Sequence, residues 1–138
     1  MNIPGTALND SLLGGEGEDT LLGSSGADTI WGNGGNDSID GGIGRDSING
    51  NKGQDIIIGG DDQDTLYGGG GDDTINGGTA RLVSIFEDGG TVSIDSAMND
   101  ADVISGDLGN DFVQGNTGND TLFGGDGNDT LFGGRGEI

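Results

Sequence analysis

Aspartates recur at a fixed spacing along this chain, and they are the residues best suited to carry out chemistry. They stand nine residues apart through a run of eight and again through a run of four, and most of them end a glycine-rich hexapeptide. Carboxylates and the exposed carbonyls of glycines together suit a hard cation that takes six or more oxygen ligands. Calcium fits better than magnesium, which retains its own waters. The aspartates are Asp10, Asp19, Asp28, Asp37, Asp46, Asp55, Asp64, Asp73, Asp102, Asp111, Asp120 and Asp129.

Other kinds of chemistry find little support in the composition. The chain has no cysteine and no histidine, which removes thiolate metal sites, the usual zinc and haem ligands and the usual general base. There is no P-loop motif, and the aspartate spacing does not fit an EF-hand. A net charge of −21 argues against a nucleic-acid partner. We therefore expect a protein that is not an enzyme.

The aspartates must be positioned by short strands and tight turns. A large aliphatic residue stands two residues after each aspartate, so the tripeptide between turns indicates a three-residue strand with one inward side chain. The glycine-rich hexapeptide must reverse the chain, which requires positive φ and close backbone approach. Two strands and two turns make an 18-residue coil, and about six stacked coils give two parallel sheets that sandwich an aliphatic row. The aliphatic residues are Leu12, Leu21, Ile30, Ile39, Ile48, Ile57, Leu66, Ile75, Ile104, Val113, Leu122 and Leu131.

The overall composition is typical of a disordered chain, because only 29% of residues are hydrophobic and the net charge is high. A disordered low-complexity segment does not keep a nine-residue phase over eight units, however. The repeat is therefore structural, and the thin core predicts that a bound cation must help the chain to fold.

The repeating unit resembles the nonapeptide of the RTX (repeats-in-toxin) family, G-G-x-G-x-D-x-U-x, in which U is a large aliphatic residue. The units Gly41–Asp46 and Gly124–Asp129 carry the pattern fully, and the resemblance covers residues 5–78 and 97–138. It implies an all-β fold, a parallel β-roll (a right-handed β-helix or solenoid), that binds calcium.

The resemblance also implies a ligand set. In that family each calcium lies between turns of adjacent coils, bound by two carbonyls and the aspartate of each turn. Carried over, three sites combine Gly15, Gly17 and Asp19 with Gly32, Gly34 and Asp37; Ser24, Gly26 and Asp28 with Gly41, Ile43 and Asp46; and Asp107, Gly109 and Asp111 with Gly124, Asp126 and Asp129. The further ligands expected are Asp10, Asn33, Gly35, Gly42, Gly44, Gly50, Asn51, Lys52, Gly53, Asp55, Gly59, Asp61, Asp64, Gly68, Gly70, Asp73, Asp102, Gly115, Thr117 and Asp120.

Pairing each unit with the next but one gives six sites in the first run and two in the second. About eight calcium ions would offset about 16 of the 21 net negative charges. We therefore expect calcium binding and folding to be coupled.

The chain divides into a first β-roll block (1–78), an insertion (79–96) and a second block (97–138) that continues the same solenoid. Alternating residues in 82–86 and 91–95, joined by Glu87–Gly90, predict a β-hairpin in the insertion. It is either a loop without a function or a lateral docking element that would use Arg81 and Phe86.

Four units depart from the repeat. The unit 5–10 lacks two turn glycines, Asp62 replaces a glycine, the unit 97–102 has no glycine, and the unit 133–138 ends on Ile138 where an aspartate belongs. We expect a weaker site at the first, an altered site at the second and doubtful calcium binding at the third.

The third, outward strand position carries several apolar residues, which indicate either local packing or a contact surface for self-association or glycan stacking. Trp31 and Tyr67 should lie on the same sheet, two coils apart. The residues are Leu13, Leu22, Trp31, Ile58, Tyr67, Phe123 and Phe132.

The resemblance to the RTX family implies a secreted, extracellular module that folds on binding calcium. The chain shows no cleaved N-terminal signal and no apolar run of membrane length. Two alternatives stay open. The chain is a structural subunit that assembles head to tail into a calcium-stabilised filament or surface layer, or it is an accessory module of a secreted enzyme.

Overall fold

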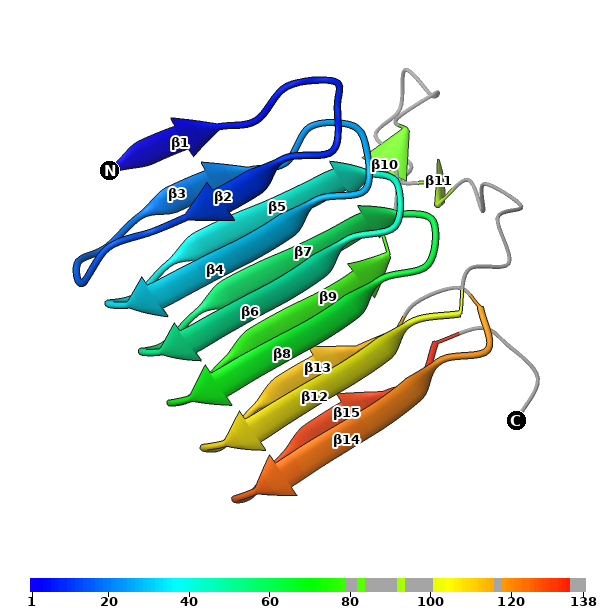
Figure 1. Ribbon diagram of the computed structural model, residues 1–138. Coiled ribbons are helices and arrows are strands. Elements are labelled where there is room, and N and C mark those ends of the chain that lie inside the picture. The colour runs from blue at the N-terminus through cyan, green and yellow to red at the C-terminus, as the bar shows by residue number, and fades with distance from the viewer. Residues whose placement is uncertain (79–81, 84–91, 94–100, 116–117, 135–138) are drawn as a thin grey trace.

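The computed structural model describes residues 1–78, 82–83, 92–93, 101–115 and 118–134. The fold is an all-β parallel solenoid of about six coils, in which two sheets lie face to face (Figure 1). The described residues contain no helix that could cross a membrane. The expected parallel β-roll is confirmed.

Successive strands alternate between the two sheets. One sheet contains seven odd-numbered strands and is called the odd sheet, and the other contains six even-numbered strands and is called the even sheet. The odd sheet consists of β1 (Asn2–Pro4), β3 (Thr20–Leu22), β5 (Ser38–Ile43), β7 (Ile56–Asp61), β9 (Thr74–Gly78), β13 (Phe112–Gln114) and β15 (Thr130–Phe132). The even sheet consists of β2 (Ser11–Leu13), β4 (Thr29–Gly34), β6 (Ser47–Lys52), β8 (Thr65–Gly70), β12 (Val103–Leu108) and β14 (Thr121–Asp126).

Neighbouring strands within a sheet pair in parallel at a constant register of 18 residues, as in the pair Ile30 and Ile48. The register changes once, across the insertion. There β8 pairs with β12 and β9 pairs with β13, so that Leu66 lies beside Ile104 and Ile75 beside Val113. Within the insertion, β10 (Leu82–Val83) and β11 (Val92–Ser93) form an antiparallel pair. Arg81, Phe86 and the segment 84–91 lie outside the described residues.

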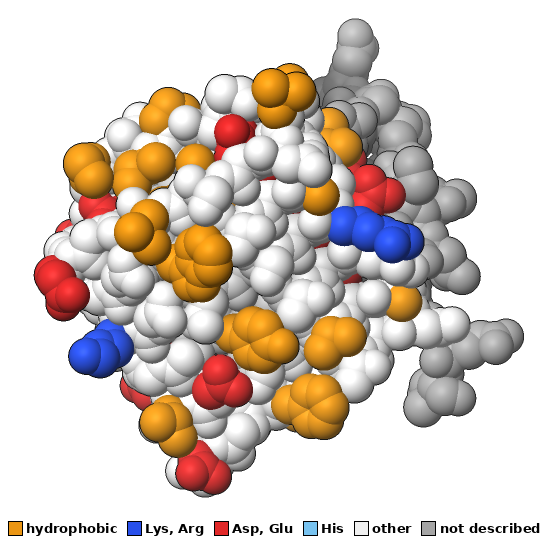
Figure 2. All heavy atoms as spheres, in the orientation of Figure 1, with side chains coloured by type: hydrophobic (Ala, Val, Ile, Leu, Met, Phe, Trp, Pro, Cys, Tyr) orange, Lys and Arg blue, Asp and Glu red, His pale blue; other side chains and the backbone are white. Residues whose placement is uncertain are grey.

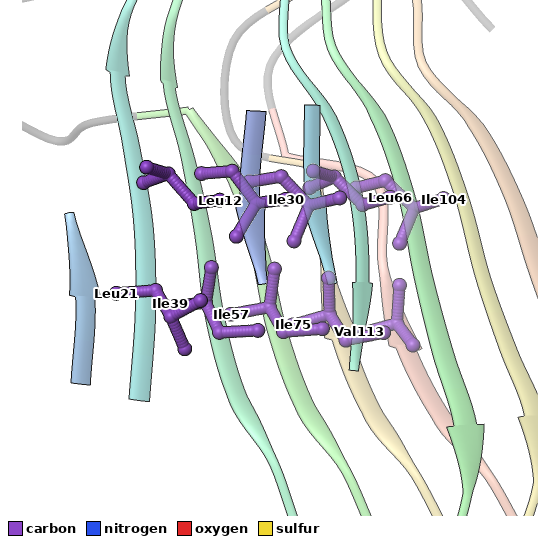
Figure 3. Packing of buried hydrophobic residues seen from close by; sticks show 10 residues of the cluster. Leu12, Leu21, Ile30, Ile39, Ile57, Leu66, Ile75, Ile104 and Val113 are labelled. Carbon is purple, nitrogen blue, oxygen red and sulfur yellow. The ribbon is translucent and has the colours of Figure 1, made fainter. Parts of the chain in front are cut away.

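The core consists of two facing rows of aliphatic side chains, one from each sheet (Figure 3). Each fully buried Leu or Ile stabilises the fold by about 1.5–3 kcal/mol. Leu122 is only partly buried, and the prediction for Leu131 was wrong, because this side chain is 45% exposed on the last strand. The buried residues are Leu12, Leu21, Ile30, Ile39, Ile48, Ile57, Leu66, Ile75, Ile104 and Val113.

The expected strand length of three residues was wrong for most of the solenoid. Strands β4 to β8, β12 and β14 have six residues, and β9 has five. The reason is that the first half of each turn also bonds to the turn of the next coil. Gly34 N–H, for example, donates to Gly15 O at 3.0 Å, and Ile43 N–H donates to Ser24 O at 3.1 Å.

Strand β1 was not expected, because Asn2–Pro4 carries neither the aspartate nor the glycines of the repeat. It pairs with β3, and Ile3 packs against the core in the place of a repeat aliphatic. Met1 takes the place of the aspartate, and its ammonium donates to Asp19 Oδ1 at 2.6 Å.

Candidate metal centres

The repeat aspartates form a continuous ladder inside the turns. From Asp28 onward, Oδ1 of each repeat aspartate accepts a hydrogen bond from the backbone N–H of the aspartate one coil earlier, at 2.7–3.0 Å. From Asp19 to Asp111 every repeat aspartate is buried, with at most 7% of its surface exposed. One carboxylate oxygen therefore holds the coils in register.

The second carboxylate oxygen, Oδ2, is different. We call the turns after 5–10 and 14–19 the inner turns, and in most of them Oδ2 is buried and finds no hydrogen-bond partner among the described residues. A buried carboxylate oxygen without a partner is costly unless a proton or a cation satisfies it. The residues concerned include Asp28, Asp37, Asp46, Asp55, Asp73, Asp111 and Asp120.

A glycine at position one of the hexapeptide leaves room beside each of these oxygens. (Position six is the aspartate.) A Cβ added to Gly32 would overlap Asp37 Oδ2, and it would also crowd the carbonyl oxygen of Gly50 in the next coil. The same arrangement recurs at Gly23, Gly41, Gly50, Gly68 and Gly106. Glycine at position one thus brings a carboxylate oxygen and a carbonyl oxygen of the following coil close to one point.

The structure brings together part of each expected ligand set. At Gly14 the Oδ2 of Asp19 meets the carbonyl of Gly32, as the first expected site requires. In the second expected site, the Oδ2 of Asp28 lies close to the carbonyl oxygen of Gly41. In the third, the Oδ2 of Asp111 lies close to the carbonyl oxygen of Gly124.

The expected carbonyl ligands at positions two and three already accept hydrogen bonds from the neighbouring turn. The carbonyl of Ile43 accepts from Gly26 N–H at 2.8 Å, and that of Asp126 accepts from Gly109 N–H at 3.0 Å. A carbonyl oxygen has two lone pairs, so it can bind a cation in addition. The turns are therefore stacked directly on one another, and a metal would have to enter between them.

Two backbone positions of the inner turns are left-handed, the second and the fourth. At position four the requirement for glycine is steric as well, because a Cβ on Gly53 would overlap the carbonyl oxygen of Gly35. Asp62 takes the same position with φ of 81°. At position two, Ser24, Asn33, Asn51 and Asp107 also have positive φ.

Burial changes the acidity of the inner carboxylates. Burial, together with a smaller contribution from neighbouring carboxylates, raises the pKa of Asp73 to about 7 and that of Asp46 to about 6. Burial also raises the pKa of Asp37, Asp55, Asp111 and Asp120. By contrast, hydrogen bonds from the terminal ammonium and from Gly15 N–H lower the pKa of Asp19. The inner carboxylates thus need a proton or a cation near neutral pH.

No three carboxylates converge among the described residues. A metal held here therefore has to draw most of its ligands from backbone carbonyls, which suits calcium rather than a transition metal. Thr117 lies outside the described residues, so the ligand expected there has no described geometry, and the same holds for the segment 97–100, in which no ligand was expected.

A family model of the RTX calcium-binding nonapeptide repeat, which describes four copies of the unit, matches most of the chain. The matches span residues 4–39, 13–48, 31–66, 49–80, 96–113 and 105–137. The chain belongs to this RTX family. A search of curated proteins found no match.

Membership in the RTX family supports calcium binding by this chain, and the turn geometry fits such a cation. The inner turns offer orphaned carboxylate oxygens beside carbonyls, which are the hard ligands that calcium takes. The structure also shows coil contacts that the sequence reasoning missed. Across the insertion, Asp64 N–H donates to Asp102 Oδ1 at 2.8 Å, and Asp73 N–H donates to Asp111 Oδ1 at 2.7 Å. The expected eight sites did not include these turn pairs, although the second block was expected to continue the same solenoid.

Proposed function

We propose that this RTX chain is a calcium-folded module of an extracellular protein, and that its calcium ions lie between the turns of neighbouring coils. The observation that carries the proposal is the set of buried Oδ2 atoms of Asp28, Asp37, Asp46, Asp55, Asp73, Asp111 and Asp120, which have no hydrogen-bond partner among the described residues. Such a set of buried oxygens costs free energy unless positive charge enters the turns. The conclusion that the chain is not an enzyme stays part of this proposal.

The expected sites pair each turn with the turn one coil later. In the first run the paired aspartates are Asp10 with Asp28, Asp19 with Asp37, Asp28 with Asp46, Asp37 with Asp55, Asp46 with Asp64 and Asp55 with Asp73. In the second run they are Asp102 with Asp120 and Asp111 with Asp129.

The contacts across the insertion raise the number of turn pairs beyond the eight expected. The turns 68–73 and 106–111 are stacked, since Gly71 N–H donates to Leu108 O at 2.7 Å and Asn110 N–H donates to Asp72 Oδ1 at 2.9 Å. We propose a further calcium at this junction, between Asp73 and Asp111. It would bind the two repeat blocks to each other.

The charge of the chain explains why folding should follow calcium. At −21 the chain repels itself, and the stacked turns concentrate this charge inside the fold. Each calcium removes two charges where the carboxylates are closest. In an environment of millimolar calcium, weak individual sites are sufficient, because extracellular modules bind with Kd of about 10⁻⁴–10⁻³ M.

The test is isothermal titration calorimetry of the chelator-treated chain with calcium, followed by circular dichroism on the same samples. We expect about eight to ten ions per chain and the appearance of β-structure over the same calcium range. Magnesium at the same concentration should leave the chain unfolded. Binding of no more than one or two ions, or full β-structure in chelator, would contradict the proposal.

The filament and accessory-module hypotheses remain predictions. Light scattering at saturating calcium separates the first from the monomeric module, because a filament grows with protein concentration.

A further inference from the structure

The outer face of the even sheet carries a column of side chains in strict register. Strand pairing places Leu13 beside Trp31, then Asn49, Tyr67, Ser105 and Phe123 in that order. From Trp31 onward, aromatic and small polar residues alternate. Trp31 is 37% exposed, Tyr67 39% and Phe123 55%, so the rings are partly accessible to a ligand.

The spacing of these rings is fixed by the sheet. Consecutive aromatic residues of the column are two strands apart, which is about 9.6 Å. At that distance the rings cannot stack on one another. The odd sheet differs, because Phe112 and Phe132 lie on adjacent strands with ring centroids 5.3 Å apart. Local packing accounts for the aromatic residues of the odd sheet but not for those of the even sheet.

The even face is also neutral, although the chain is strongly acidic. All first and third strand positions of this sheet, from Ser11 to Phe123, are hydroxyl, amide or apolar residues. The middle of this face is largely orange and white in Figure 2. Asp107, at the edge of this face, accepts a hydrogen bond from Ser105 Oγ at 2.6 Å. A neutral face favours an uncharged ligand, because an anionic polymer would be repelled by the rest of the molecule.

Hydrogen-bonding groups lie beside the aromatic column. A hollow of about 380 Å³ borders it at Asn49, and its lining includes Asn33, Asn51, Lys52 and Asp107. Amide, ammonium and carboxylate groups together can donate to and accept from hydroxyl groups. A sugar has apolar ring faces and polar edges. Aromatic rings with such polar groups beside them can therefore bind both parts of a sugar.

We propose that the outer face of the even sheet binds an extended, uncharged, β-1,4-linked polysaccharide. Such a chain presents the same ring face at every second sugar. The length of its disaccharide repeat is close to two strand spacings, which together measure about 9.6 Å. The polysaccharide lies along the solenoid axis, stacks on Trp31, Tyr67 and Phe123, and hydrogen-bonds to Asn49 and Ser105 between them.

The first test uses cellohexaose as the probe, at saturating calcium. Trp31 is the one tryptophan in the chain, so its fluorescence reports directly on this face. We expect a saturable change in emission with cellohexaose. Maltohexaose is the matched control, because its α-1,4 linkages curve the chain away from a flat row of rings, and it should give no saturable change.

The variants Trp31→Asn and Tyr67→Ser replace the rings with residues that the same column already carries at 49 and 105. Each should weaken retention on microcrystalline cellulose by about fivefold or more, the loss expected for one stacking platform. The control Phe112→Thr removes an aromatic residue from the odd sheet. It introduces the residue found at the same position of β3, β9 and β15, and retention should be unchanged. Circular dichroism at saturating calcium checks that each variant folds. If Trp31→Asn does not fold, the retention of Tyr67→Ser alone tests the proposal.

The proposal is overturned if wild type shows no binding to cellohexaose or cellulose, or if Phe112→Thr weakens retention as much as Tyr67→Ser. It is also overturned if Tyr67→Ser instead abolishes self-association in light scattering without sugar, since the face would then join two copies of this chain. Light scattering on the same samples reports calcium-dependent compaction separately, so the calcium proposal and the polysaccharide proposal can fail independently.

Discussion

The two entry turns (5–10 and 14–19) and the inner turns treat the same carboxylate oxygen differently. In the entry turns Oδ2 is satisfied within its own turn: Thr6 N–H donates to Asp10 at 2.6 Å, and Gly15 N–H donates to Asp19 at 2.5 Å. In the inner turns that end at Asp28, Asp37, Asp46, Asp55, Asp73, Asp111 and Asp120, Oδ2 has no hydrogen-bond partner among the described residues. The hexapeptide thus has a closed form, which needs no cation, and an open form, which does.

The backbone changes together with the carboxylate. No residue in 5–10 or 14–19 has positive φ, whereas the inner turns are left-handed at positions two and four. Gly14–Asp19 matches the repeat fully, so its closed form does not follow from its own residues. The comparison teaches that stacking between coils, and not the motif alone, creates the open form. We infer that calcium dependence resides chiefly in the inner turns.

The largest difference is expected from alanine at position four. Gly53→Ala places a Cβ against the carbonyl of Gly35 and forces a left-handed residue, so it should lower the free energy of unfolding by about 2–4 kcal/mol. Gly17→Ala occupies the same position of an entry turn, where nothing lies within 4 Å, and should change stability by less than about 1 kcal/mol. Thermal unfolding at saturating calcium measures both. Equal effects would show that the entry turn also opens when calcium binds.

The next largest difference is expected from removing one carboxylate charge. Asp55→Asn should raise the calcium concentration at the folding midpoint about tenfold, because an orphaned charged ligand is lost. Asp10→Asn should shift the midpoint about twofold or less, since Asp10 Oδ2 is already bonded to Thr6. Circular dichroism during calcium titration compares the two variants. A larger shift for Asp10→Asn would reverse our assignment of the calcium-dependent turns.

The pH dependence of the metal-free chain should separate the two kinds of turn. The pKa of Asp46 is raised to about 6 and that of Asp73 to about 7, above the ordinary value of 3.8. Protonation of these groups therefore favours the folded state. Their contribution is complete below about pH 3.8 and is lost as the pH rises through about 6 to 7. In chelator, β-structure should increase as the pH falls from 7.5 to 4.5.

Two variants sharpen this pH test. Asp73→Asn should flatten the upper part of the profile, because the amide needs no proton. The pKa of Asp19 is lowered, so its contribution has the opposite sign: it is present above the ordinary pKa and is lost as the pH falls through the lowered value. Asp19→Asn should therefore leave the gain between pH 7.5 and 4.5 in place. A gain in wild type that Asp73→Asn does not reduce would contradict the assignment.

The smallest effect is expected at Asp62, which among the described residues is the one that holds the left-handed fourth position of a turn without being glycine. Asp62→Gly removes the cost of positive φ and the repulsion that Asp62 exerts on Asp46, so it should stabilise the chain by about 1 kcal/mol. Thermal unfolding at saturating calcium measures the change. Destabilisation would indicate instead that the Asp62 side chain contributes to a calcium site.

The repeat determined the parts of the fold that depend on local periodicity. The aliphatic residue two positions after each aspartate predicted the inward side chains, and ten of the twelve are buried. The exceptions, Leu122 and Leu131, lie on the last two strands of the described solenoid. The burial of a side chain on such a strand depends on the neighbouring coil that covers it, and the local repeat pattern does not indicate whether that coil is present.

The features that escaped the sequence reasoning depend on neighbouring coils. The six-residue strands exist because turns bond to turns, as Gly34 does to Gly15, and a single unit gives no sign of this. Strand β1 joins the sheet with only Ile3 in common with the repeat. The closed turn 14–19 differs from inner turns of the same sequence type. For the ligands, sequence placed the carboxylates in one column, but it could not show that one oxygen of each is already used in the ladder.

The most direct test of the account is multi-angle light scattering after size-exclusion chromatography, in chelator and then across a calcium titration at neutral pH. We predict an expanded monomer in chelator that becomes a compact monomer over the concentrations at which calorimetry detects calcium binding. A hydrodynamic size that does not change with calcium would contradict the central claim, because the buried carboxylates of the inner turns would then need no cation.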